Sequence, residues 1–167
     1  MIKEVNYTAY ADKAIEILSK GAFLTTTAAG QVNTMTIAWG SIGFIWAKPV
    51  FMVMVRPSRH TYKLIEESGE FTVSIPLKDM KEALALCGSK SGRDLDKLAA
   101  AGLTTLPGQK IATPGIAGCG LHFECKILYK QTMTQENLDP AITAAKYATG
   151  DFHTLYYGEI VSAYVEE

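Results

Sequence analysis

The stretch VRPSRHTYK at 55–63 carries two arginines, a histidine and a lysine around one proline. An apolar run ends here and helical spacing begins, so Pro57 stands where a helix starts. The first turn of a helix has free backbone N–H groups, and with the helix dipole and a guanidinium fork they suit an anion such as a phosphate. The side chains that would surround the anion are Arg56, Ser58 (as the helix cap), Arg59, His60 and Thr61.

The alternative for this turn is a solvated basic face, which is the common fate of arginine and lysine. Cations at a helix N-terminus oppose the dipole, however, and cost a little stability unless an anion offsets them. The sequence therefore favours an anion site.

A second turn of this kind is SKSGRDLDK at 89–97, whose polar residues include Ser89, Arg93 and Lys97. Ser91 and Asp94 have the S-x-x-D spacing of a capping box, which predicts a helix over 93–101. An ordinary capped helix explains this stretch equally well. Two helix starts that could each bind an anion nevertheless favour a phosphorylated ligand with a polar tail.

A third cluster is NTMTIAWGS at 33–41, in which polar and apolar side chains alternate with the period of a strand. Taken alone, threonines in a half-buried strand reflect only β propensity. The surrounding Met35, Trp39 and Trp46 would suit an apolar, flat portion of a ligand.

Signatures of other chemistries are missing or incomplete. GCGLHF lacks the third glycine of a dinucleotide fingerprint, CGSKSGRD lacks the P-loop spacing, and there is no G-x-S-x-G elbow. Cys119 and Cys125 resemble metal ligands, but on a strand they would lie ~20 Å apart with His122 on the opposite face. Buried structural thiols are the better interpretation.

Length and composition predict one domain over 1–167. A net charge of -1 gives no reason to expect nucleic acid or a membrane surface as a partner, and no apolar run approaches the ~18 residues that span a bilayer. The N-terminus lacks the apolar core of a signal peptide, and three cysteines form no even disulfide framework. The cytoplasm is therefore the expected location.

The hydrophobic periodicity and the turn residues along the chain predict mainly strands with a few helices, which is an α+β barrel. Helices are expected at 8–19, 61–69, 79–87 and 93–101. Strands are expected at 22–40 (two segments around Gly30), 48–57, 70–76, 120–133 and 153–167, with a looser segment at 134–151. The first helix would bury a stripe of Ala11, Ala14, Ile15 and Leu18, and strand 48–57 would be buried on both faces. Strand 70–76 would point Thr72 and Ser74 outward.

From about Phe23 to the C-terminus, the chain resembles the flavin reductase-like domain, in the flavoredoxin group of FMN-binding split barrels. The motifs that carry the resemblance are N-x-M-T, R-P-S-R-x-T and S-G-R-D-x-D-K in this order, followed by GDFHTLYYGEIVSAYV at 150–165. The combination is fairly specific, whereas 103–118 and 135–150 match only loosely.

The resemblance implies a split β-barrel that binds FMN and is usually a homodimer with the flavin near the subunit interface. The strand that begins at Asn33 would lie along the isoalloxazine ring, with contacts from Met35, Thr36, Ala38 and Trp39. The phosphate would be held by Arg56, Ser58, Arg59 and Thr61, with His60 close by. The loop that closes over the cofactor would supply Ser89, Ser91, Gly92, Asp94 and Lys97, and His153 would approach the site.

Flavin chemistry also explains the absence of a catalytic motif, because hydride passes directly from a nicotinamide donor to the flavin and the protein supplies binding and electrostatics. We therefore expect an FMN-binding oxidoreductase that takes electrons from NAD(P)H and gives them to a small-molecule or protein acceptor. The alternatives are a flavoredoxin-like electron-transfer protein without NAD(P)H activity, and a non-catalytic flavin-binding protein.

Overall fold

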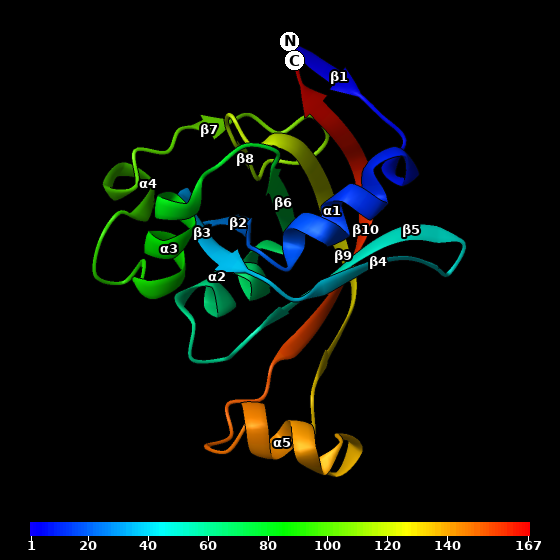
Figure 1. Ribbon diagram of the computed structural model, residues 1–167, viewed down its shortest axis with the longest axis vertical. Coiled ribbons are helices and arrows are strands. Elements are labelled where there is room, and N and C mark those ends of the chain that lie inside the picture. Colours follow the sequence, from blue (N-terminus) through cyan, green and yellow to red (C-terminus); the bar gives the residue numbers. More distant parts are fainter.

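The computed structural model describes residues 1–167, and its main feature is an antiparallel sheet of eight strands that curls into a barrel (Figure 1). The strand order is β3-β2-β6-β9-β10-β5-β4, and β1 pairs with the end of β10. The strands are β1 (Ile2–Glu4), β2 (Ala22–Ala28), β3 (Gln31–Ile37), β4 (Gly40–Ile45), β5 (Lys48–Val55), β6 (Glu70–Pro76), β9 (Gly120–Thr132) and β10 (Thr154–Glu166). Short strands β7 (Thr105–Leu106) and β8 (Gly115–Ile116) form a separate ribbon.

Helices lie on the side of β2 and β3, in front of the sheet near β4 and β10, and at its lower end (Figure 1). They are η1 (Tyr7–Tyr10), α1 (Ala11–Leu18), α2 (His60–Ser68), α3 (Lys81–Ser89), α4 (Lys97–Ala100), η2 (Gln135–Asn137) and α5 (Pro140–Lys146). The ends of β9 and β10 extend beyond the barrel as an arm that carries α5 (Figure 1). None of the helices is long and apolar enough to cross a membrane.

The barrel encloses the hydrophobic core, in which Phe51 and Phe123 meet edge to face at 5.5 Å. Each fully buried aromatic or aliphatic side chain contributes ~1.5–3 kcal/mol. β10 bends at a register shift after Tyr157, and there Gly158 lies so close to Phe71 that an added Cβ would stand 2.7 Å from the ring. Only glycine allows the strands to approach in this way.

The structure contains the predicted strands and helices, but for two of them a different set of side chains is buried from the set predicted. β5 is not buried on both sides, because Phe51, Val53 and Val55 point into the core while Met54 is only half-buried on the outer face. On α1, Ile15 is exposed, and Ile17 packs against the core instead.

Strand β6 is buried on both faces, so the prediction that Thr72 and Ser74 point to solvent is wrong. The segment 103–118 covers that face. Thr72 donates a hydrogen bond to the carbonyl of Thr113 (3.1 Å), and Ser74 Oγ accepts one from the backbone N–H of Ile116 (3.0 Å).

The predicted start of the helix at 93–101 is also wrong, because α4 begins only at Lys97. Its cap is Asp96, whose carboxylate accepts the N–H of Ala99 at 3.1 Å, rather than Ser91, which closes a turn by accepting the N–H of Arg93. The looser segment contains a helix that the sequence analysis missed, α5, which Asp139 caps.

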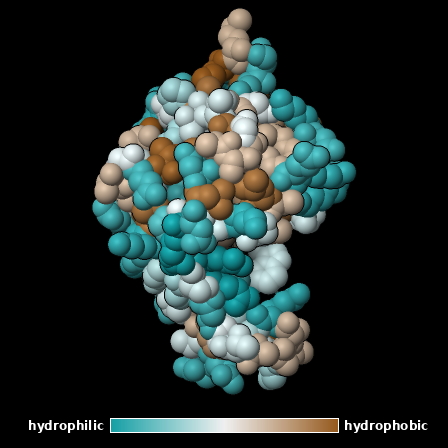
Figure 2. Space-filling model, turned by 90° about the vertical axis from the view of Figure 1, so that its left-hand side faces the viewer, coloured by the Kyte–Doolittle hydropathy of each residue, from teal (hydrophilic) through white to brown (hydrophobic).

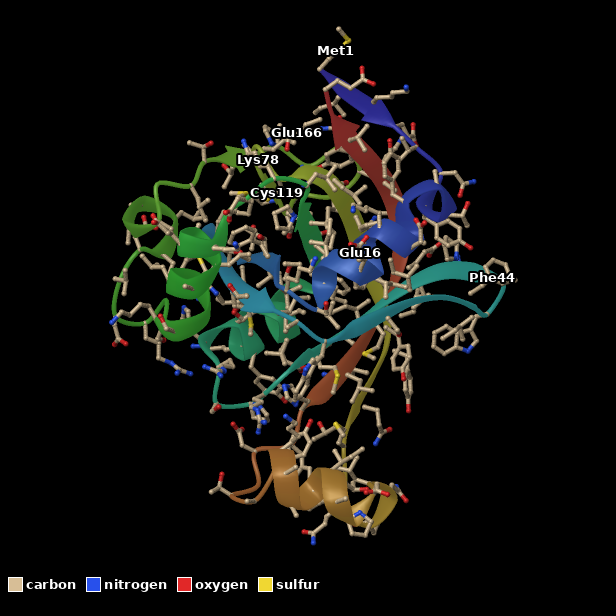
Figure 3. The ribbon with its side chains drawn as sticks, viewed as in Figure 1. Met1, Glu16, Phe44, Lys78, Cys119 and Glu166 are labelled. Carbon is tan, nitrogen blue, oxygen red and sulfur yellow. The ribbon has the colours of Figure 1, made fainter.

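The three cysteines are buried and unpaired. His122 is fully buried and stacks on Tyr164 at 4.9 Å, and its two nitrogens pair with Ser74 Oγ (2.9 Å) and Glu166 Oε1 (2.7 Å). Cys119 and Glu166 lie at the end of the barrel far from α5 (Figure 3).

Candidate functional site

Two adjoining pockets lie along β3 and the N-terminus of α2, and both are lined by Met35, Thr36 and Arg59. The basic pocket, of about 150 Å³, is lined by Met35, Thr36, Ser58, Arg59, His60, Thr61, Cys87, Gly88, Ser89, Lys90, Ser91, Gly92, Arg93 and Lys97. The Trp39 pocket, of about 250 Å³, is lined by Met35, Thr36, Ile37, Ala38, Trp39, Met54, Arg56, Arg59 and His153.

The basic pocket concentrates positive charge in a chain that is nearly neutral. Its ionisable side chains, apart from the thiol of Cys87, are Arg59, His60, Lys90, Arg93 and Lys97, and no carboxylate lines it. Seen from the side that carries α3 and α4, the surface is mixed, and hydrophilic residues cover the part just above the arm (Figure 2). The local field therefore favours an anion.

Helix α2 begins without a side-chain cap. Arg59 is the N-cap residue, with extended backbone angles and no capping hydrogen bond. The predicted cap, Ser58, instead donates its hydroxyl and its backbone N–H to the carboxylate of Asp151. Because the Ser58 hydroxyl is bonded to Asp151, it does not cap α2. The N–H groups in the first turn of α2 are therefore available to a ligand that can accept hydrogen bonds.

Arg56 does not reach freely into the basic pocket. Its guanidinium donates to the carbonyls of Asp151 (3.0 Å) and Lys146 (2.9 Å) and lies 4.7 Å from the centroid of the Tyr147 ring. These contacts hold the segment that follows α5 against the end of β5, so Arg56 shapes the Trp39 pocket from its edge.

Lys97 is the most unusual group in the basic pocket. Its side chain is only 6% exposed, and the ammonium donates to a single acceptor, the carbonyl of Cys87 at 3.0 Å. No carboxylate pairs with it. Burial lowers the pKa of Lys97, the Cys87 thiol beside it acts to raise that pKa, and the positive charge of Arg59 lowers it further, so the net effect disfavours the charged form.

His60 also carries a polar atom without a partner. Its Nε2 is buried and has no hydrogen-bond partner. Burial, followed by the positive charges of Arg93 and Lys97, lowers the pKa of His60, so the ring is neutral at pH 7. A buried nitrogen without a partner costs free energy that a ligand atom would recover.

Other predicted residues build the wall of the site. Asn33 donates from Nδ2 to Thr61 Oγ1 at 2.8 Å and so joins β3 to α2. Gly92 lies against it so tightly that an added Cβ would stand 2.2 Å from Asn33 Oδ1. Thr36 uses its hydroxyl to donate to the carbonyl of Leu84 at 2.6 Å, which ties α3 to β3.

The Trp39 pocket is flatter and more apolar. Trp39 is 43% exposed, and His153 lies beside it with ring centroids 5.5 Å apart. Burial, and then the charge of Arg56, lower the pKa of His153 to about 4.

Most of the predicted site residues thus line one of the two pockets. Asn33 and Asp94 line neither pocket, although Asn33 supports the wall through its hydrogen bond to Thr61. Sequence reasoning did not select Ile37, Met54, Cys87, Gly88 and Lys90 for the site, and it named Arg93 only as a polar residue of the second turn. Asp151 was missed because it acts through Ser58 and Arg56, which lie more than ninety positions away.

Comparison with solved structures identifies the curled sheet as the split-barrel fold of FMN-binding flavin reductase-like proteins. An FMN-binding domain of a flavin reductases-like enzyme from Shewanella baltica OS155 matches with a TM-score of 0.71 at 22% identity, over 99% of this chain and 77% of that chain. Flavoredoxins from Desulfovibrio vulgaris (Miyazaki F) and Methanosarcina acetivorans match with TM-scores of 0.70 and 0.68 at 26% and 28% identity, each over 88% of this chain and over 69% and 68% of theirs.

The family model "Flavin reductase like domain" matches residues 17–167. The chain belongs to the flavin reductase-like domain family, as the sequence motifs predicted. Among curated relatives, an uncharacterized protein of Pyrococcus abyssi is 30% identical over 141 residues, which are 82% of this chain and 69% of that protein. One of Archaeoglobus fulgidus is 27% identical over 139 residues, which are 83% of this chain and 68% of that protein.

Proposed function

We propose that this chain binds FMN across the two pockets and acts as an oxidoreductase that takes electrons from NAD(P)H and passes them to a small-molecule or protein acceptor. The phosphate would occupy the basic pocket and the ring system the Trp39 pocket. The observation that carries the proposal is Lys97, a buried ammonium with one carbonyl partner and no carboxylate beside an uncapped helix N-terminus.

The residues present fit the phosphate. Its oxygens would accept hydrogen bonds from Lys97, from Arg59 and from the first turn of α2, and the dianion would neutralise charges that otherwise repel each other. The unpartnered Nε2 of His60 would gain a partner in the same pocket.

The Trp39 pocket fits a planar ring. The backbone from Met35 to Trp39 forms one side, and Met54 contributes a polarisable side chain from β5. Bound FMN would supply the redox chemistry by accepting hydride from a nicotinamide donor. The chain's own share is to orient the ring, to shield it from water and, through Arg56 and Arg59 at the pocket edge, to stabilise negative charge on it.

A second candidate function is electron transfer without NAD(P)H activity. It is favoured by sequence identity, which is 26% and 28% to the two flavoredoxins and 22% to the flavin reductases-like enzyme from Shewanella baltica, while the TM-scores of the three are nearly equal. The flavin would then receive electrons from a protein partner.

A homodimer would cover apolar surface that the single chain exposes. Phe44 and Trp46 at the tip of the β4–β5 hairpin are 66% and 54% exposed, and Trp46 packs edge to face on Tyr129 and Tyr157 from the arm. The hairpin projects from the barrel and Phe44 marks its tip (Figure 3). A second copy of the chain would bury this aromatic face, because large contiguous apolar patches are typical of interfaces.

The test is the visible absorption spectrum of the purified chain with FMN, followed by NADH and NADPH without oxygen. Flavin bands that bleach with either donor support the oxidoreductase. Bands that persist until dithionite is added favour the electron-transfer protein instead. A chain that binds no FMN overturns both.

A further inference from the structure

Tyr147 makes a contact with His153 that neither the motifs nor the family assignment anticipate. Its hydroxyl lies 2.6 Å from His153 Nδ1, while its ring stacks on Phe152 at 5.0 Å and lies under the guanidinium of Arg56. Tyr147 is only 4% exposed and lies at the end of α5. Its phenol is therefore fixed on three sides and directed at one ring nitrogen.

The direction of this hydrogen bond follows from the partners available. Burial raises the pKa of Tyr147, so the phenol keeps its proton at neutral pH. Besides Nδ1, the hydroxyl has only the thioether of Met133 as an acceptor, at 3.6 Å. A thioether is a weak acceptor and an imidazole nitrogen a strong one, so the phenol donates to Nδ1.

The tautomer of His153 is set by that bond, because a neutral imidazole that accepts at Nδ1 carries its hydrogen on Nε2. Nε2 lies on the opposite edge of the ring, and the ring lines the Trp39 pocket. The groups that act on its charge are Arg56, Arg59 and Asp151, while Lys146 lies over the neighbouring Trp39. Two arginines and burial outweigh the one carboxylate, which keeps the ring neutral.

We propose that Tyr147 is a positioning residue that holds His153 as a neutral Nε2–H donor, and that this donor binds an acceptor atom of a planar ligand, a carbonyl oxygen or an unprotonated ring nitrogen, in the Trp39 pocket. The ligand part rests on the proposed function, in which FMN occupies that pocket. The donor would not change its charge between neutral and mildly acidic pH, so it selects an acceptor without adding a cation.

The first experiment needs no ligand. Two-bond ¹H–¹⁵N correlation spectra of the chain report the tautomer and pKa of His153, with Tyr147→Phe as the variant and Tyr129→Phe as the control. Tyr129 also makes one phenol hydrogen bond, to Gln131, but lines neither pocket. We expect the Nε2–H tautomer in the wild type and in the control. In Tyr147→Phe we expect a tautomer mixture and a higher pKa, because the bond that stabilises the neutral ring is lost.

An Nδ1–H tautomer in the wild type, or an unchanged tautomer and pKa in Tyr147→Phe, would overturn the positioning role. This result does not depend on whether FMN binds, so it is separable from a failure of the proposed function.

The second experiment uses FMN as the probe. FMN should shift the Nε2–H resonance of His153, and Tyr147→Phe should weaken FMN binding about three- to tenfold, which is the loss of one neutral hydrogen bond. Inorganic phosphate should inhibit FMN binding equally in both proteins, because the basic pocket is untouched. FMN that binds to the wild type without shifting this resonance would overturn the ligand part. Failure of FMN to bind would overturn the ligand part together with the proposed function.

Discussion

Replacement of Lys97 by methionine should weaken FMN binding without lowering the stability of the fold. In the ligand-free chain the ammonium is buried, has one carbonyl acceptor at 3.0 Å and has no counterion. Methionine has a similar length and no charge, so the variant removes a desolvation penalty of several kcal/mol and loses one charge-assisted hydrogen bond of about 1.5–3 kcal/mol. These two effects have opposite signs, and we expect the free energy of unfolding to stay within about 1 kcal/mol of the wild type or to rise.

The same substitution should weaken FMN binding strongly. A hydrogen bond to a charged group contributes about 1.5–3 kcal/mol, which corresponds to a loss of roughly 10- to 150-fold in affinity. Quenching of flavin fluorescence measures the affinity, and urea denaturation measures the stability. Lys63→Met is the matched control, because Lys63 is exposed on α2 and lines neither pocket.

An affinity within about twofold of the Lys63→Met control would refute the assignment of Lys97 to the phosphate. A loss of stability above about 2 kcal/mol would refute the claim that the ammonium is an uncompensated charge, because removal of a stabilising partner has that signature.

Three further predictions concern the pockets and the far end of the barrel. Arg59→Ala should weaken FMN binding by about 1.5–3 kcal/mol, measured by the same titration. Gly92→Ala should lower the free energy of unfolding by about 1–3 kcal/mol, since its Cβ would stand 2.2 Å from Asn33 Oδ1, whereas Gly43→Ala, with open space around it, should not. Burial would raise the pKa of Glu166, but hydrogen bonds from Gly118, His122 and Gly120 outweigh this and lower it. The stabilisation from Glu166 is therefore present above its unfolded pKa of about 4.5 and lost as pH falls through the lower folded value, so Glu166→Gln should flatten the acid limb of denaturation.

The order of strands and helices could be predicted from the sequence because it depends on patterns of neighbouring residues. The turn at Gly30, the helix stop at Gly69 and the long strands β9 and β10 each follow from nearby residues. The same locality explains the family motifs, which place most pocket residues on consecutive stretches.

The burial of the polar face of β6 could not be predicted from such local patterns. Thr72 and Ser74 have the alternation of an exposed strand face, but a segment about forty residues away covers them. A period of two shows that two faces differ and does not show whether the second face meets water or more protein.

The two helix caps predicted from residue spacing, Ser58 and Ser91, make other hydrogen bonds in the structure. Ser58 was the predicted cap of α2, but it lies one position before the N-cap residue Arg59, and its hydroxyl donates to the carboxylate of Asp151. In the second turn α4 begins later than predicted, so Asp96 is its cap and Ser91 accepts the N–H of Arg93 instead. The pairing of Ser58 with Asp151 leaves α2 without a side-chain cap, and no local sequence pattern predicts this pairing.

The most direct test of the central claim compares FMN with riboflavin, which has the same ring system and no phosphate. If the basic pocket holds the phosphate, FMN should bind at least about thirtyfold more tightly, and the difference should shrink as salt is added. Equal affinities for the two ligands would contradict the assignment of the basic pocket and of Lys97.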